Sequence, residues 1–399
     1  MKYNFDEEVN RKGTNSVKWD NLKNIFGRDD IIPLWVADTD FKAPIEVIEG
    51  IKKRADHGVF GYTFRGSSYN ESVKNWLKRR HQWEIEREWI TFSPGIVPAL
   101  STCVNTFTNP GDKVIIQSPI YPPFRSVVEG NGRKIIDNEL AFKNNRYCMD
   151  LENLKRQIFK SNGEFDYKVK MLILCSPHNP TGRVWEKNEL LELGKICYEN
   201  NIIIVSDEIH SDIVYKNHKH IPIASLSEEL KNSTITCISP SKSFSLAGLA
   251  SSAIIIPNKK LLNLFNASLD TAHIAGGNIF GNIALEEAYN NGDDYLDELI
   301  LYLEDNLNYC IDYFNEKIPQ IKPLRPESTY LVWLDCSKLG LEDKELMNFF
   351  INKAKVGVNP GSSFSKKYKD FVRLNIGCTK KTLKEALYRI EKAVKEVIR

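Results

Sequence analysis

The chain has 399 residues, which is enough for a large hydrophobic core and for two domains. Its 54 basic and 52 acidic residues leave a formal net charge of +2, and neither half is strongly basic, so nothing indicates nucleic-acid binding. No apolar run approaches the ~20 residues of a membrane-spanning helix, and the polar N-terminus lacks the apolar stretch of a signal peptide. We therefore expect a cytoplasmic protein.

Short apolar runs alternate with a helical pattern in the middle of the chain. The runs are rich in β-branched residues and lack polar alternation, as strands buried on both faces do. Between two of them, apolar residues recur at helical spacing from Leu190 to Cys197. This alternation predicts an α/β fold with a mainly parallel sheet. The predicted strands cover 113–117, 169–175, 201–206, 234–239 and 253–256.

The C-terminal part has a different pattern. TYLVWLDC (329–336) and FVRLNIG (371–377) read as strands, and apolar residues between Leu383 and Ile398 recur at the spacing of an amphipathic helix. These elements predict a smaller α+β domain that the N-terminal segment joins. The predicted domains are a large one, 46–285, and a small one, 1–45 with 286–399.

Eight cysteines are spread along the chain, and none forms a CxxC pair. Several lie inside apolar runs, such as Cys175 in MLILCSP. We therefore expect buried free thiols rather than disulfides or zinc ligands.

Two motifs combine a tight turn with polar groups. In SPGIVPAL (93–100) a glycine turn opens a helix and leaves the amides of Ile96 and Val97 free, which is how helix N-termini bind phosphate. In SPHNPTG (176–182) two prolines and a glycine fix a turn at a strand end, and Asn179 projects an amide there. Alone, the first is no stronger than any helix start, and Asn179 could be a plain turn residue.

Two further motifs place charged groups after strands. Asp207 in SDEIH (206–210) would be a nearly buried carboxylate, which needs a partner such as a protonated pyridine nitrogen. The alternative is an aspartate that caps a helix. Lys242 in SPSKSF (239–244) follows a buried strand, where open α/β sheets bind ligands. Alone, it could be a surface lysine in a serine-rich turn.

The order and spacing of these motifs resemble the class I/II aminotransferase family of fold-type I pyridoxal 5′-phosphate (PLP) enzymes. Asn179, Asp207 and Lys242 are separated by 28 and 35 residues, as are the three residues that hold PLP in that family. The resemblance implies a large domain with a mainly parallel sheet of the seven-stranded type. VFGYTFRG, SPIYPPF, VSDEIHSDIVY and STYLVWLD resemble the bacterial cystathionine β-lyase/cysteine-S-conjugate β-lyase (C–S lyase) branch, which has histidine where most aminotransferases have tyrosine.

The resemblance implies roles around the cofactor ring. Lys242 would bind PLP covalently and later move protons, while Asp207 would pair with the pyridine nitrogen. Asn179 would bond the 3′-oxygen, His210 would lie beside that oxygen, and Tyr121 would stack on the ring. The structural alternatives are a core histidine for His210 and ordinary packing for Tyr121.

The resemblance also implies phosphate and substrate ligands. The phosphate ligands would be the amides of Ile96 and Val97 and the hydroxyls of Ser239 and Ser241. Tyr62 matches a tyrosine that reaches the phosphate from a neighbouring subunit, and Arg373 matches the arginine that clamps the substrate's α-carboxylate. Packing and a surface ion pair are the respective alternatives. One departure is Ala250, where many relatives have a phosphate-binding arginine.

The implied function is a PLP-dependent carbon–sulfur β-lyase that cleaves cystathionine or another L-cysteine thioether to a thiol, pyruvate and ammonia. The implied assembly is a homodimer with its site at the subunit interface. The alternatives are an aminotransferase of the same family and a PLP-binding regulatory protein with little turnover. A metal hydrolase built on His210, His218 and His220 is disfavoured, because no carboxylate occurs at ligand spacing.

Overall fold

The computed structural model describes residues 2–397. Backbone contacts divide the chain into two compact units. Unit 1 consists of Met1–Lys42, Asn179–Gly182 and Asp294–Arg399, and unit 2 consists of Ala43–His178 and Arg183–Asp293. The domains predicted from the sequence, 46–285 and 1–45 with 286–399, stay a prediction.

A mixed sheet of seven strands forms the centre of unit 2, in the order β2-β10-β9-β8-β7-β3-β4. From β4 to β9 all neighbouring strands are parallel, whereas β10 runs antiparallel to both β2 and β9. The predicted, mostly parallel fold-type I sheet is thus confirmed. The strands are β2 (Ile90–Ser93), β3 (Lys113–Ile116), β4 (Lys134–Asp137), β7 (Val169–Cys175), β8 (Ile203–Asp207), β9 (Thr234–Ile238) and β10 (Ser252–Ile255).

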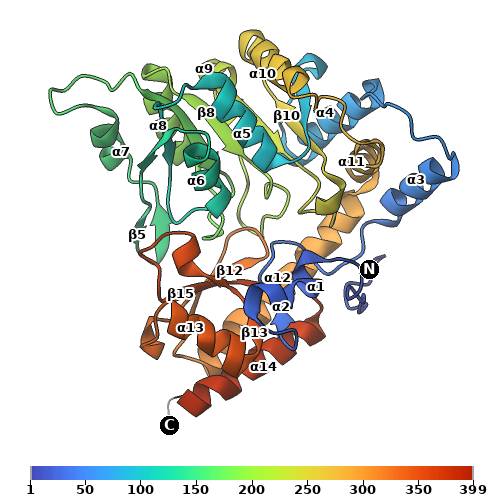
Figure 1. Cartoon of the computed structure of the whole chain (residues 1–399), viewed down its shortest axis with the longest axis vertical. Helices are drawn as coiled ribbons and strands as arrows, with labels where there is room; N and C mark the ends of the chain where they lie inside the picture. Colours follow the sequence, from blue (N-terminus) through green and yellow to red (C-terminus); the bar gives the residue numbers. More distant parts are fainter. Residues whose placement is uncertain (1, 398–399) are drawn as a thin grey trace. The chain divides into compact units, whose positions relative to one another are not determined.

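Helices surround this sheet, and a small hairpin of β5 (Ala141–Lys143) and β6 (Arg146–Cys148) stands apart from it (Figure 1). The predicted helix around 190–197 is present as α8. The helices of unit 2 are α3 (Ile45–Asp56), α4 (Ser67–His81), α5 (Ile96–Phe107), α6 (Pro122–Glu129), α7 (Leu151–Ile158), α8 (Lys187–Glu199), α9 (Glu228–Ser233), α10 (Lys259–Thr271) and α11 (Ile279–Asn291).

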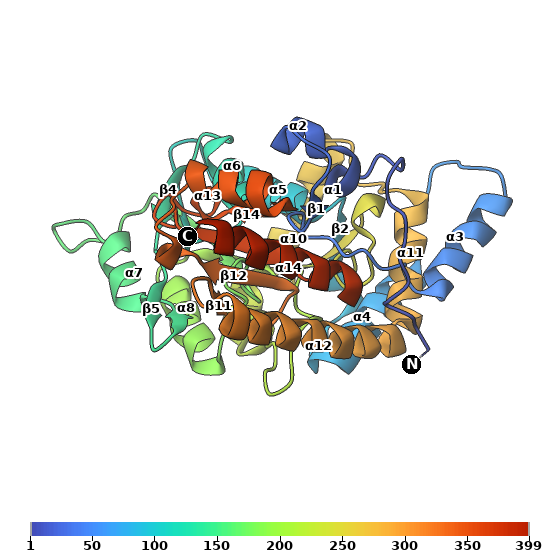
Figure 2. The ribbon, with the colours of Figure 1, turned by 90° about the horizontal axis from the view of Figure 1, so that it is seen from below.

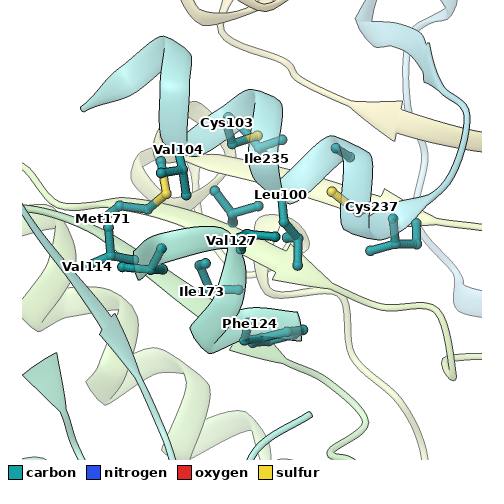
Figure 3. Packing of buried hydrophobic residues seen from close by; sticks show 14 of the residues in the cluster. Leu100, Cys103, Val104, Val114, Phe124, Val127, Met171, Ile173, Ile235 and Cys237 are labelled. Atoms are coloured by element: carbon teal, nitrogen blue, oxygen red, sulfur yellow. The ribbon is translucent and has the colours of Figure 1, made fainter. Parts of the chain in front are cut away.

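The hydrophobic core of unit 2 lies between the sheet and helices α5 and α6 (Figure 3). Leu100 and Val104 of α5 and Phe124 of α6 point toward Met171 and Ile173 of β7, and all five are buried. Burying one such side chain stabilises the fold by roughly 1.5–3 kcal/mol. This packing holds the strand ends in fixed positions.

Unit 1 contains a four-stranded antiparallel sheet and a separate parallel pair, β1 (Ile32–Pro33) with β13 (Val356–Gly357). The sheet has the order β11 (Lys322–Leu324), β12 (Leu331–Asp335), β15 (Phe371–Asn375) and β14 (Asn359–Pro360). The two strands predicted within 329–336 and 371–377 are β12 and β15, so these expectations are confirmed. The short helices are α1 (Val17–Asp20), α2 (Leu22–Phe26) and α13 (Lys344–Asn348).

Two long helices complete unit 1, α12 (Asp293–Lys317) and α14 (Lys380–Val397) (Figure 2). α14 is the predicted amphipathic helix, with Leu383, Leu387 and Ile390 buried; the predicted last apolar position, Ile398, lies outside the described residues. The phenol of Tyr313 on α12 donates a hydrogen bond to a carboxylate on α14, that of Glu391.

All eight cysteines have free thiols, and seven of them are buried, as expected. Among residues 2–397, no helix combines the length and the apolar character that crossing a bilayer requires.

Candidate active site

The predicted site residues of unit 2 follow strands that end at one edge of the sheet. Parallel pairing places Asp207, the last residue of β8, beside Cys175 of β7 and Cys237 of β9. Because β10 is antiparallel to both β2 and β9, those two strands also end at the same edge. The carboxyl ends of strands are where open α/β sheets bind ligands.

Asp207 is buried at this edge, with an exposed fraction of 6%. Its Oδ1 accepts a hydrogen bond from the amide of Ile209 at 3.1 Å, and it forms no salt bridge within residues 2–397. Burial raises the pKa of Asp207 to about 7, although the Ile209 amide and the charge of Lys242 both act to lower it. A carboxyl group in this state fits a cationic hydrogen-bond donor such as a protonated pyridine nitrogen.

Lys242 lies in a tight turn that follows β9. The amide of Phe244 donates to the carbonyl of Pro240 at 2.9 Å, and that of Leu246 donates to Ser241 at 3.2 Å, so the turn closes around the lysine. Lys242 itself is half-buried, while its neighbour Ser243 is fully buried. Its charge acts on the pKa of Asp207, so Lys242 and Asp207 lie within electrostatic reach of one another.

The start of α5 offers the predicted phosphate donors. Gly95, with φ of 149°, turns the chain between β2 and the helix, and Ile96 and Val97 form the first helical turn. First-turn amides have no partner within their helix, and the helix dipole favours an anion beside them. A helix begins where the sequence predicted one.

The first two serines of SPSKSF, Ser239 and Ser241, are hydrogen-bonded to each other. The hydroxyl of Ser239 donates to the carbonyl of Ser251 at 2.8 Å and accepts from the amide of Ser241 at 3.2 Å. Ser239 is buried and Ser241 half-buried. These bonds fix the strand-to-turn junction that precedes Lys242.

His210 follows β8 and Tyr121 follows β3, two parallel strands of this edge with β7 between them. His210 is buried in the turn after β8, and its carbonyl accepts from the amide of Ile213 at 3.1 Å. No α-helix begins after Asp207 in this turn, so the helix-cap alternative for that aspartate is wrong. Tyr121 is half-buried and occupies the N-cap position of α6.

Tyr62 does not pack against its own unit. It is fully exposed in the segment between α3 and α4, together with three other large apolar residues, Val59, Phe60 and Phe64. An exposed group of this kind is typical of a protein–protein contact.

In unit 1 the structure brings Arg373 and Asn179 together. Arg373 lies in the middle of β15, with an exposed fraction of 3%, and its Nη1 donates to Asn179 Oδ1 at 2.9 Å. Its Nη2 donates to the carbonyl of Trp35 at 3.0 Å and to Asn359 Oδ1 at 2.7 Å. All three of these acceptors are neutral, and a buried guanidinium binds a carboxylate more strongly than it binds neutral oxygens.

Gly182 closes the NPTG turn that carries Asn179. Its φ is +69°, and a Cβ there would lie 2.3 Å from Pro326 Cβ, so only glycine fits. The Gly182 carbonyl accepts from the amide of Glu327 at 2.9 Å and from the hydroxyl of Ser328 at 3.0 Å. The turn is therefore held at both of its ends by other residues of unit 1: Arg373 bonds Asn179, and the segment 327–328 bonds Gly182.

Asp212, which lies five residues after Asp207, has no role in the prediction from sequence motifs. The structure places its buried carboxylate among three side-chain donors, those of Trp76, His81 and Ser243. The only sequence signal was its place in SDEIHSD. No three His, Cys, Asp or Glu side chains gather to form a metal site anywhere in the described chain.

Comparisons with known proteins agree with this architecture. The profile of the family "Aminotransferase class I and II" matches residues 29–390. The chain is 45% identical to the cystathionine beta-lyase PatB of Bacillus subtilis, and the alignment covers 98% of this chain and all of the relative.

Two solved structures are similar along almost the whole chain. One is cystalysin from Treponema denticola, which contains a pyridoxal 5′-phosphate cofactor (TM-score 0.94, 37% identity, 99% of this chain and 100% of that one). The other is the PLP-bound C–S lyase from Staphylococcus hominis (TM-score 0.90, 33% identity, 98% of each chain). The fold, the strand-end site and these matches together show that the chain belongs to the class I and II aminotransferase family.

Proposed function

We propose that this chain is a PLP-dependent carbon–sulfur β-lyase that cleaves cystathionine or another L-cysteine thioether to a thiol, pyruvate and ammonia. The observation that carries the proposal is Asp207, a buried carboxyl group with a raised pKa and no salt bridge within the described chain, at the edge where Lys242 also lies. Whole-length similarity to a cystathionine β-lyase and to C–S lyases selects the reaction within the family.

The cofactor is pyridoxal 5′-phosphate, and when bound it supplies a sink for the electron pair left on the substrate's α-carbon. Asp207 would keep its pyridine nitrogen protonated, and Lys242 would hold it covalently. Asn179 and His210 would flank the 3′-oxygen, while Tyr121 would stack on the ring. The Lys242 amine, when not bonded to the cofactor, would act as the general base that takes the substrate's α-proton. The substrate's Cβ–S bond would then break, the sulfur would leave as a thiolate, and water would hydrolyse the remaining enamine to pyruvate and ammonia.

The phosphate would be held mainly by neutral donors. These are the amides of Ile96 and Val97, the hydroxyl of Ser241, that of Ser239 once it turns from the Ser251 carbonyl, and Tyr62 of a second copy. The start of α5 supports this assignment, since its dipole contributes the positive potential that Ala250 does not supply.

The substrate is an amino acid, and we assign its α-carboxylate to Arg373. Arg373→Ala is expected to raise KM for cystathionine roughly 10- to 100-fold while PLP stays bound, because a charge-assisted bond contributes about 1.5–3 kcal/mol. Steady-state kinetics and the cofactor content of the purified variant check this. Arg373→Lys is the matched control: it keeps the charge but loses the planar fork, so its KM should be intermediate. If amines that lack a carboxylate lost activity equally, Arg373 would have a structural role instead.

The proposed assembly is a homodimer in the cytoplasm, with the active site completed by Tyr62 from the second copy. The exposed segment that contains Val59, Phe60, Tyr62 and Phe64 supports it, because a second chain would cover these side chains. Light scattering during gel filtration should give twice the mass of the chain, which is 45.8 kDa. A monomer with full activity would contradict this part of the proposal.

An aminotransferase is the second candidate, because it needs the same cofactor ligands and the family profile also covers such enzymes. The two differ in the fate of the nitrogen: the lyase releases it as ammonia, whereas the aminotransferase keeps it on the cofactor for a keto acid. With cystathionine and no keto acid, we expect many turnovers that yield equal amounts of pyruvate, ammonia and thiol. One turnover that restarts only after a keto acid is added would identify an aminotransferase.

A further inference from the structure

We propose that Asp212 is a positioning residue for Lys242: through Ser243 and Trp76 it fixes the turn that carries the lysine against helix α4. The inference deepens the proposed function and rests on Lys242 as the cofactor lysine. All the residues that carry it belong to unit 2.

Asp212 is a buried hub in the turn after β8. Its Oδ1 accepts from the indole of Trp76 at 3.0 Å and lies 2.9 Å from Nε2 of His81, both on α4. Its Oδ2 accepts from the hydroxyl of Ser243 at 2.7 Å. Burial alone would raise the pKa of Asp212, but His81, Ser243 and Trp76 together lower it, so the carboxylate is ionised at neutral pH.

The Lys242 turn is held to α4 at two consecutive residues. Ser243 is bonded to Asp212, and the ring of Phe244 meets the Trp76 ring edge-on, with centroids 5.7 Å apart. Trp76 in turn stacks on Tyr289 at 5.0 Å, so it cannot move freely. Since Ser243 and Phe244 are both fully buried, the backbone next to Lys242 has one well-defined place.

Glu208, the residue after Asp207, forms a second carboxylate–histidine pair, like that of Asp212 with His81. The Glu208 carboxylate accepts from Ser206 at 2.8 Å and lies 2.8 Å from Nε2 of His220. The rings of His220 and His81 are perpendicular, with centroids 5.5 Å apart. Two carboxylate–histidine pairs therefore hold the turn after β8, and the Ser243–Asp212 bond joins that turn to the one that carries Lys242.

Asp212 and Ser243 do not touch the substrate, but they should affect the rate because they hold the turn that carries Lys242. A lysine that holds the cofactor, leaves it and then accepts the α-proton must return to one position in each turnover. Removing the Ser243–Asp212 bond loosens the turn, so it should reduce kcat and leave KM unchanged.

Ser243→Ala tests the inference in the holoenzyme. We expect kcat for thioether cleavage to fall about 10-fold, because one hydrogen bond to a charged group is lost. KM should stay within about twofold of its value in the unaltered enzyme. The pH midpoint of the bound cofactor's visible absorption should also shift, since that spectrum reports on Lys242. Asp212→Asn should give the same pattern with a larger loss.

Ser72→Ala is the matched control, because Ser72 is an equally buried serine of α4 whose hydroxyl donates to the Tyr69 carbonyl at 2.8 Å. It should change the melting temperature but neither kcat nor the pH midpoint. The inference is overturned if Ser243→Ala keeps its kcat and pH midpoint, or if Ser72→Ala loses as much kcat. If Asp212→Asn does not fold, Ser243→Ala decides the question.

Borohydride reduction and peptide mapping of the unaltered enzyme test the assignment of Lys242 separately. A label on another lysine would refute the proposed function.

Discussion

Lys242→Ala is expected to abolish covalent attachment of PLP and to lower the rate of thioether cleavage by at least about 10³-fold. The lysine has two roles in the proposed reaction, and loss of a general base alone typically costs 10²- to 10⁴-fold. The turn itself should survive, because its bonds run through the backbone of Phe244 and Leu246 and the side chain of Ser243. The measurements are the visible absorption of the protein after gel filtration with PLP and the rate of pyruvate release.

The control for this variant is Lys260→Ala, which removes an exposed lysine of α10 in the same unit. It should bind PLP and turn over like the unaltered enzyme. If Lys242→Ala still formed a borohydride-reducible bond to PLP, another lysine would hold the cofactor and the central assignment would be wrong.

The hydrophobic pattern predicted the strands well where it was strongest. β3, β7 and β9 fall within predicted apolar runs, and β8 and β10 overlap their runs with one residue outside each, Asp207 and Ser252. Yet the pattern did not predict that β10 runs antiparallel to both of its neighbours. Burial on both faces leaves the same apolar run whatever the direction of the strand. β2 and β4 were missed, because only two of the four residues in each are apolar.

The candidate site could be predicted from motif order because its groups follow strand ends. Asp207 and Lys242 come after parallel neighbours, so their closeness follows from the topology. The contact of Arg373 with Asn179 spans 194 residues, and that of Ser243 with Asp212 joins two separate turns. Such bonds depend on tertiary placement, which no local pattern encodes. The roles given to the site residues stay predictions until the variants are measured.

Asp207→Asn is expected to keep PLP bound but to lose roughly 10²-fold or more in turnover. A neutral amide cannot keep the pyridine nitrogen protonated, so the electron sink weakens. Loss of one buried charge pair costs about 2–5 kcal/mol, and 1.36 kcal/mol corresponds to tenfold in rate. Single-turnover kinetics with cystathionine measure the effect, and near-normal rates would refute the role.

The same substitution should change how the stability of the cofactor-free protein depends on pH. Burial raises the pKa of Asp207 from 3.8 to about 7, so between these values the folded state binds a proton that the unfolded state has released. Stability therefore falls as pH rises through this window. Between pH 5 and pH 8 the contribution of Asp207 is about 2–3 kcal/mol, at 1.36 kcal/mol per pKa unit. Cofactor-free Asp207→Asn should lose that much less stability than the unaltered protein over the same range, as followed by urea unfolding at the two pH values.

PLP should remove most of this penalty in the unaltered protein, because the pyridinium gives the ionised carboxylate a partner. If the two cofactor-free proteins lost equal stability, Asp207 would be ionised and already compensated in the folded chain, and the observation that carries the proposed function would fail.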